Sequence, residues 1–457
     1  MPTQRKIDLV VESVRRLLRV GATSNLLNLL QKQHPADLGQ VFTELPEKEK
    51  YAVFNVLVEK NGKLAMEALS ELGPEAGAVL LALRPAEEIA RLTQEIPSDD
   101  AAALIDHLPE ELSAAVLDLI RPKPGGGVSE LLEYEEKTAG RLMNPNVFAL
   151  SEELSASEAI TALQTARDVE MVFYLYIVDE RRHLVGVISL RRLLLVSPDT
   201  PLKRIMTTDV YSARVDTDQE EVARQVASYN LLAIPVVDAE NKLAGLITVD
   251  DVIDVIKDEA TEDVYRLAGV SKYDGPLTPP IDSLRRRLPW LLVNLLTAFI
   301  AAYVVSLFQA TIQKVVILAA FMPIVAGMGG NAATQTLAVI VRGLALGELT
   351  WANARQALFK EALVGLGNGV VIGIAGAIFV GLFSHDWALG AILGAAMVIN
   401  LFIAATAGTL IPLGLRAANV DPALASSVFI TTFTDVFGFL SFLGLATLFL
   451  RFLVSTP

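Results

Sequence analysis

The chain has 457 residues, 52% of them hydrophobic, and a formal net charge of −14. The length allows two to four domains, and the mean hydropathy of +0.45 is high for a soluble protein. The absence of cysteine excludes disulfides and thiolate chemistry, and the acidic balance argues against nucleic acid as a partner, because phosphate binding needs basic patches.

Residues 1–130 predict an all-helical, superhelical N-domain. Apolar positions recur at the helical period, and "ADLGQVFTELPEKEKYAVFNVL" (36–57) aligns with "DDAAALIDHLPEELSAAVLDLI" (99–120). Repeated helical hairpins of this kind stack into a small α-solenoid. The stretch "RPKPGGG" (121–127) then predicts a linker.

A second repeat lies between residues 141 and 262. "YIVDERRHLVGVISLRRLL" (176–194) aligns with "PVVDAENKLAGLITVDDVI" (235–253) at a constant offset of 59. Each copy predicts a strand, a turn, a second strand and a helix, which indicates paired α/β modules. These residues resemble tandem CBS domains, expected at 138–202 and 203–262. CBS domains often bind adenine nucleotides or regulate an attached channel.

The resemblance to CBS domains leaves ATP open as a ligand. The second copy has Thr248 and Asp251 in "TVDD", which matches the Thr/Ser-x-x-Asp pattern that holds a ribose in the family. The first copy has Ser189 and Arg192 in "SLRR", with an arginine at the position of the acid. The substitution weakens the implied nucleotide site in the first copy.

A strongly acidic segment, "TVDDVIDVIKDEATEDVYRLAGV" (248–270), leads toward the hydrophobic third of the chain and carries seven acids within 16 residues. At helical spacing six of these acids form two groups, each on one face. A solvated helix face is the ordinary interpretation of a charge run. The alternative is a cation sensor, because clustered carboxylates repel one another unless cations screen them. The groups are Asp251, Asp254 and Asp258, and Glu259, Glu262 and Asp263.

Five long apolar runs predict five membrane-spanning helices in residues 285–457, since about 20 apolar residues cross a bilayer. Basic residues gather before the first run, between the second and third, and after the fourth. The positive-inside rule places that side in the cytoplasm, so the N-terminus is expected inside and the C-terminus outside. The runs are 288–313, 315–341, 362–385, 387–415 and 422–450.

Asp435 interrupts the last run near its middle. Placing a charge there costs at least ~2.5–3.5 kcal/mol, so an intramembrane acid is a functional-site hypothesis by default. Ser427 and Thr431 lie on the same helix face at spacings of four, and could line a wet path with it. Alternatively, the acid is protonated and hydrogen-bonded between helices, and the hydroxyls bond their own helix.

The second run contains "PIVAGMGGNAATQT" (323–336), in which Gly327, Asn331 and Gln335 share a face. Two amides in a span are costly unless they meet partners or water. The alternative is a small-residue packing seam with amides joining the helices. Carboxylate, amide and hydroxyl oxygens suit Mg²⁺, Ca²⁺ or Mn²⁺, although this chemistry does not exclude Na⁺ or protons.

The motifs "GMGGNAATQT" and "DPALASSVFITTFTDVFG", together with the order of domains, resemble the MgtE family of bacterial magnesium channels. The resemblance implies an inner-membrane homodimer with one Mg²⁺ pore between the second and fifth spans, lined by Asp435, Asn331, Ser427 and Thr431. It also implies a connecting or plug helix in residues 263–284. Bound intracellular Mg²⁺ would close the pore. The implied regulatory ligands are Asp251, Asp254, Glu259, Glu262, Asp263, Asp218, Glu220, Asp99 and Asp100.

Two other functions remain open from the sequence. One is a divalent-cation carrier, proton- or ion-coupled through Asp435, that moves Co²⁺ or Mn²⁺. The other is a membrane-anchored metal or nucleotide sensor that conducts nothing. An enzyme is not expected, because the sequence has no P-loop, no HExxH motif and no nucleophile–base pairing.

Overall fold

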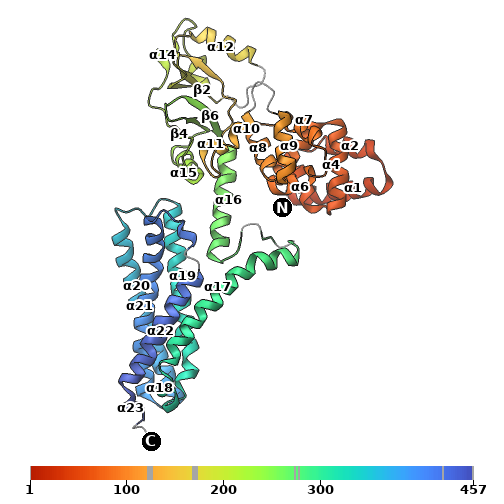
Figure 1. The fold of residues 1–457 in the computed structure, drawn as a ribbon. Helices are drawn as coiled ribbons and strands as arrows, with labels where there is room; N and C mark the ends of the chain where they lie inside the picture. Colours follow the sequence, from red (N-terminus) through yellow and green to blue (C-terminus); the bar gives the residue numbers. More distant parts are fainter. Residues whose placement is uncertain are drawn as a thin grey trace. The chain divides into compact units, whose positions relative to one another are not determined.

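The computed structural model describes residues 2–120, 127–166, 173–271, 274–275, 278–424 and 427–454 (Figure 1). The chain divides into two compact units, Met1–Val255 and Ile256–Pro457. The first unit holds the helical N-domain and both α/β copies, and the second holds the predicted spans. Residues 121–126 of the predicted linker lie outside the described residues.

The N-domain is helical, as predicted, and its helices share one apolar core. Pro35 and Pro74 occupy the first turn of their helices, where a missing N–H group costs nothing. The two aligned segments form the pairs α3–α4 and α8–α9. The elements are α1 (Pro2–Val20), α2 (Thr23–Leu30), α3 (Pro35–Glu44), α4 (Glu47–Lys60), α5 (Gly62–Leu72), α6 (Pro74–Leu81), α7 (Ala86–Leu92), η1 (Thr93–Glu95), α8 (Ser98–Asp106) and α9 (Glu110–Ile120).

Each α/β copy forms a three-stranded sheet, in the orders β1-β2-β3 and β4-β5-β6. The first pair of strands in each sheet is parallel and the second is antiparallel. Tyr174 pairs with Ser189, and Ala233 pairs with Thr248, so the strand register repeats at the predicted sequence offset. The strands are β1 (Ala149–Ser151), β2 (Tyr174–Val178), β3 (Leu184–Ser189), β4 (Ala213–Arg214), β5 (Ala233–Val237) and β6 (Leu243–Thr248). The helices are α10 (Gly127–Leu131), α11 (Ala139–Leu142), α12 (Ala156–Thr165), α13 (Leu190–Leu194), α14 (Leu202–Ile205) and α15 (Gln219–Tyr229).

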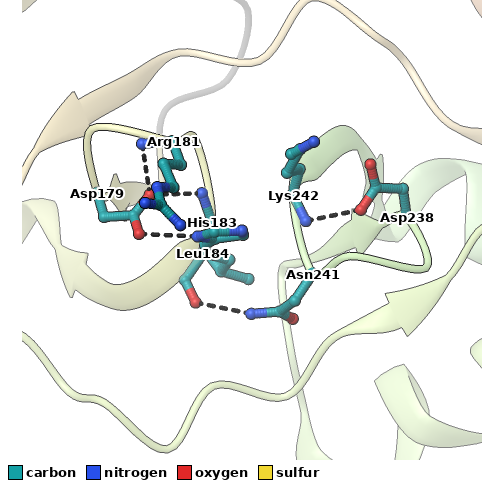
Figure 2. Close-up of polar contacts among 7 residues, drawn as sticks. All are labelled: Asp179, Arg181, His183, Leu184, Asp238, Asn241 and Lys242. Atoms are coloured by element: carbon teal, nitrogen blue, oxygen red, sulfur yellow. Dashed lines mark hydrogen bonds and ion pairs between the residues drawn. The ribbon is translucent and has the colours of Figure 1, made fainter.

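The repeated Val-Asp turns join the two copies. Asp179 and Asp238 each accept backbone N–H bonds from their own turn, which holds the β2–β3 and β5–β6 hairpins in the same shape (Figure 2). Asn241 then donates from Nδ2 to the carbonyl oxygen of Leu184 at 3.2 Å (Figure 2). The backbone N–H of Leu184 donates in return to the carbonyl of Asn241. The two copies of the internal repeat therefore contact each other through the turns of their hairpins.

The acidic segment forms one helix, α16 (Val249–Leu267), so a single helix crosses the predicted boundary between residues 262 and 263. Thr248 and Asp251 begin it: the Thr248 hydroxyl donates to Oδ2 of Asp251 at 2.6 Å. Gly269 follows the helix with a φ of +68°, and a Cβ there would collide with the indole of Trp290. A glycine is needed at this turn for both reasons.

The five predicted spans are confirmed as five helices long and apolar enough to cross a membrane (Figure 1). They are α17 (Pro280–Ser306), α19 (Leu318–Ala345), α20 (Ala354–Ser384), α21 (Trp387–Ala417) and α22 (Ser427–Leu448). Shorter elements lie between and after them: α18 (Gln309–Lys314), η2 (Pro422–Leu424) and α23 (Leu450–Val454). Helix α21 packs against α19, α20 and α22, which places it at the centre of the bundle.

Small residues let α20 and α21 approach closely, as the glycine-rich sequences predict. A Cβ at Gly373 would lie 2.6 Å from the carbonyl oxygen of Gly394, and a Cβ at Gly394 would lie 2.8 Å from that of Gly373. Gly365 and Gly369 meet α21 in the same way. Backbone contact of this kind is how helices associate in lipid, where apolar burial supplies little attraction.

We expect Gly373→Val to push α20 and α21 apart and to destabilise the membrane unit by about 1–3 kcal/mol, the usual cost of overpacking. Gly367→Val is the matched control, because nothing lies within 4 Å of a Cβ at this glycine of the same helix. Thermal denaturation of the detergent-solubilised protein measures both variants. Equal loss of stability in the two would contradict the packing account.

Candidate functional site

Helix α22 carries the predicted polar face of the last span. Ser427, Thr431 and Asp435 all belong to it, although the Ser427 side chain lies outside the described part of the structure. Asp435 is partly exposed, and within the described residues no hydrogen bond or ion pair engages its carboxylate. The alternative of a carboxyl hydrogen-bonded between helices therefore has no described partner that would supply the bond.

Helix α19 packs directly on α22 and carries the second predicted polar face. A Cβ at Gly330 would lie 3.4 Å from the methyl group of Thr431, so the two backbones come close at this level. Asn331 follows Gly330 and is exposed, as is Gln335. The structure thus brings together the helices that carry Asn331, Thr431 and Asp435. The Asn331 side chain is exposed, and those of Thr431 and Asp435 are partly exposed.

Two polar groups of the bundle were missed from the sequence. Glu361 precedes the predicted third span, yet α20 begins at Ala354, so Glu361 lies within the helix, buried, and accepts a hydrogen bond from Thr336 of α19 at 3.2 Å. Asn400 lies in the middle of α21 and is fully buried. A lone amide inside the run 387–415 was the available signal for the second group.

In the first unit, Asp99 at the start of α8 lies beside Asp251 at the start of α16. Burial raises the pKa of Asp99 well above its usual value, and the negative charges of Asp251 and Asp100 raise it further. Burial also raises the pKa of Asp251 to about 6, against an opposing hydrogen bond from Thr248. The Oδ1 atom of Asp99 is buried and has no hydrogen-bond partner among the described residues.

A bound cation would lower the electrostatic cost of placing these carboxylates close together. Two of the predicted regulatory residues, Asp100 and Asp251, act electrostatically on a third, Asp99, and Asp254 adds to the negative field at Asp251. Within the described ranges no three acidic or histidine side chains converge as a complete metal-ligand set. Mg²⁺ commonly binds through one or two carboxylates and keeps several waters, so such a convergence is not required.

The other predicted regulatory residues have different surroundings. Asp218 caps α15 by accepting the backbone N–H of Glu220 at 2.8 Å, and Glu220 pairs with Arg224 at 3.5 Å. Glu262 is buried on α16 and pairs with Arg266. Glu259 and Asp263, which are partly buried, lie on the same helix.

Arg266 links α16 to the loop before the last span. Its guanidinium pairs with Glu262 one turn earlier on its own helix and with Asp421, just before η2. Leu267 packs beside it against an apolar cluster built from α19, α21 and α22, which includes Leu337 and Ile430. This pair could not be predicted from the sequence, because its members are far apart in the chain.

The chain was compared with known families and proteins. Residues 322–445 match the MgtE family, described as a divalent cation transporter, residues 33–137 match the MgtE intracellular N domain, and residues 139–199 and 202–258 match CBS domains. The magnesium transporter MgtE of Enterococcus faecalis is 39% identical over 422 residues, covering 92% of this chain and 93% of that protein. Its counterpart from Thermus thermophilus is 35% identical, covering 96% and 98%.

Among solved structures, the chain is similar to the cytosolic domain of the Mg²⁺ channel MgtE in complex with ATP. The similarity has a TM-score of 0.50 at 37% identity and covers 54% of this chain and 99% of that one. The matches to whole relatives span nearly the entire chain, with the N-domain, the CBS pair and the five spans in the order predicted. The chain is a multi-pass membrane protein that belongs to the MgtE family of magnesium transporters.

Proposed function

We propose that the chain is a Mg²⁺-selective channel whose ion path runs between α19 and α22, with the Asp435 carboxylate as the ion site. The observation that carries this proposal is a partly exposed acid in the middle of a span, without a described side-chain partner. It lies on α22, which packs against α19, the helix that carries Asn331. A charge is tolerated at such a depth where it faces a watery path and a counter-ion.

Hydrated Mg²⁺ fits this site by its chemistry. Mg²⁺ gives up its waters reluctantly and is usually held by one or two carboxylates through those waters. The path offers one acid per chain, with amide and hydroxyl oxygens nearby at Asn331 and Thr431. A homodimer with its twofold axis along the path would supply two carboxylates, and we propose that assembly, with the N-terminus inside the cell and the C-terminus outside.

We expect Asp435→Asn to lower Mg²⁺ uptake into proteoliposomes at least about 10-fold. Mutating a residue that only orients a metal ligand already costs about that much, and here the ligand itself is removed. Ser441→Ala is the control: its hydroxyl lies on the same helix but only bonds the Gly438 carbonyl at 3.0 Å. A fluorescent Mg²⁺ indicator inside the vesicles reports the flux.

Uptake by Asp435→Asn equal to wild type would contradict the proposed ion site. The same vesicles separate a channel from a carrier. A channel gives flux that rises linearly with Mg²⁺ concentration, and unitary current steps in planar bilayers. Saturable uptake that requires a proton gradient would instead support the coupled carrier.

We further propose that intracellular Mg²⁺ closes the path by binding the acidic surfaces of the first unit and of α16. Without cations, Asp99, Asp100 and Asp251 repel one another and favour an open arrangement. A bound cation offsets this repulsion in the compact form. The change in population cannot exceed the difference in the ions' affinity for the two forms, so several weak sites acting together are expected.

The raised pKa values give this regulation a pH signature. Asp251 titrates near 3.8 when unfolded and at about 6 when folded, so the folded chain holds a proton that the unfolded chain has released. Stability therefore falls as pH rises across this range, and the loss is complete above it. We expect Mg²⁺ to raise the melting temperature of the full-length protein more at about pH 7.5 than at about pH 5.5.

The same melting experiment compares wild type with Asp251→Asn. The extra stabilisation by Mg²⁺ at the higher pH should be lost in this variant. Asp216→Asn is the control, since Arg214 beside this exposed acid lowers its pKa and gives it a pH dependence of the opposite sign. If the stabilisation by Mg²⁺ is the same in Asp251→Asn and wild type, Asp251 is not part of a cation site.

Arg266 gives a second test of regulation. We expect Arg266→Gln to loosen α16 from the loop at Asp421, so that more Mg²⁺ is needed to halve the flux, because the closed arrangement has lost an ion pair. Asp421→Asn, which removes the same contact from the other side and leaves the Arg266–Glu262 pair, should shift the midpoint in the same direction. Flux recorded against the Mg²⁺ concentration on the cytoplasmic side measures both, and an unchanged midpoint in Arg266→Gln would remove this contact from the gating scheme.

A nucleotide is the other candidate ligand of the CBS pair, since the similar cytosolic domain was crystallised with ATP. In this chain Asp251, at the position of the ribose-holding acid, already accepts bonds from Thr248 and lies beside Asp99. These contacts favour a cation at Asp251, and we leave ATP outside the proposed mechanism.

A further inference from the structure

Asn400 is a buried amide at the centre of the membrane bundle. It lies midway along α21, is fully buried, and has apolar neighbours such as Met397 and Leu401. An amide at this depth is costly unless its polar atoms are paired. Within the described residues its Nδ2 atom has a partner and its Oδ1 atom has none.

The amide group lies between α19 and α22. Its Nδ2 donates to the carbonyl oxygen of Val325 in α19 at 2.8 Å. A Cβ at Gly329 of α19 would lie 2.4 Å from this nitrogen, and a Cβ at Gly438 of α22 would lie 2.8 Å from it. Only glycine fits at either position, so the thickness of the Asn400 amide sets the separation of the two helices there.

This contact lies next to Asp435 along α22. Gly438 follows Asp435 by three residues, and Thr431, which meets Gly330 of α19, precedes it by four. Residues three and four apart are neighbours on a helix surface, so Asp435 lies between the two places where α22 is fixed against its surroundings. A change at Asn400 would move the turn that carries the carboxylate.

A simpler account would make Asn400 a hydrogen bond that only holds the bundle together. Two features argue for more than that. The Oδ1 atom is buried and has no hydrogen-bond partner among the described residues, which is a cost that a purely structural amide would not need to carry. In addition, both helices that meet the amide are the ones that line the proposed path.

We propose that Asn400 is a positioning residue of the ion path: by separating Gly329 from Gly438 it places Asp435 at the spacing that a hydrated Mg²⁺ requires. The inference rests on the proposed role of Asp435. Asn400 does not touch the ion itself, and it acts on selectivity through the geometry of α22.

The test measures Mg²⁺ and Ca²⁺ flux into proteoliposomes for Asn400→Leu and Asn400→Ala. Leucine keeps the branched shape, with a larger volume, without the hydrogen bond, and alanine leaves space between the glycines. We expect the preference for Mg²⁺ over Ca²⁺ to fall about 10-fold, the usual effect of altering a group that orients a metal ligand. Thr409→Val is the control, because this fully buried hydroxyl of the same helix only bonds the Ala405 carbonyl.

A structural role alone would lower the yield or the melting temperature, and would leave the Mg²⁺ to Ca²⁺ ratio of the reconstituted protein unchanged. An unchanged ratio in Asn400→Leu or Asn400→Ala, whichever can be reconstituted, would overturn the proposal. Asp435→Asn is measured alongside. If this variant conducts normally, the proposed ion site has failed. If it loses flux while Asn400→Leu keeps the Mg²⁺ to Ca²⁺ ratio, only the role of Asn400 is overturned.

Discussion

The cost of placing one carboxylate in the middle of a membrane is the constraint on which this structure depends. Asp435 is the acid at that depth on α22, and it can remain charged only where water and a cation reach it. A watery path needs two helices that present polar groups and approach each other closely. In the proposed path, the glycines of α19 allow the close approach, Thr431 offers a hydroxyl, and α21 packs against both helices.

Carboxylates in costly surroundings also occur in the first unit, where we propose that they regulate the path and do not conduct the ion. Asp99 and Asp251 lie at the starts of two helices, and burial raises the pKa of both carboxyl groups, with the negative charge of Asp251 raising that of Asp99 further. In the proposed mechanism a cation bound there offsets the negative charge, so that the first unit would respond to the ion that the membrane unit transports. In both units the fold places carboxylates where their charge is costly, and we propose that the ion supplies the opposite charge.

Much of this could be predicted from the sequence, because periodicity identifies elements and charge identifies unusual positions. The repeat at 176–194 and 235–253 fixed the strand register in advance, and the apolar runs located all five spans. Periodicity does not reveal which partner lies against a given face. Asn400 and the pair of Arg266 with Asp421 therefore emerged only from the structure, since each depends on segments that are distant in the chain. The closeness of Asp99 and Asp251 was expected only through the family resemblance.

The most direct measurement is to locate the ion itself. Crystals of the full-length protein grown with Mn²⁺, a divalent cation with anomalous scattering, would show where the path holds a metal. The account predicts an anomalous peak beside the Asp435 carboxylate, at the distance of a water-mediated contact, that disappears in Asp435→Asn. A peak in the membrane unit that persists in Asp435→Asn, or one that lies away from α22, would contradict it.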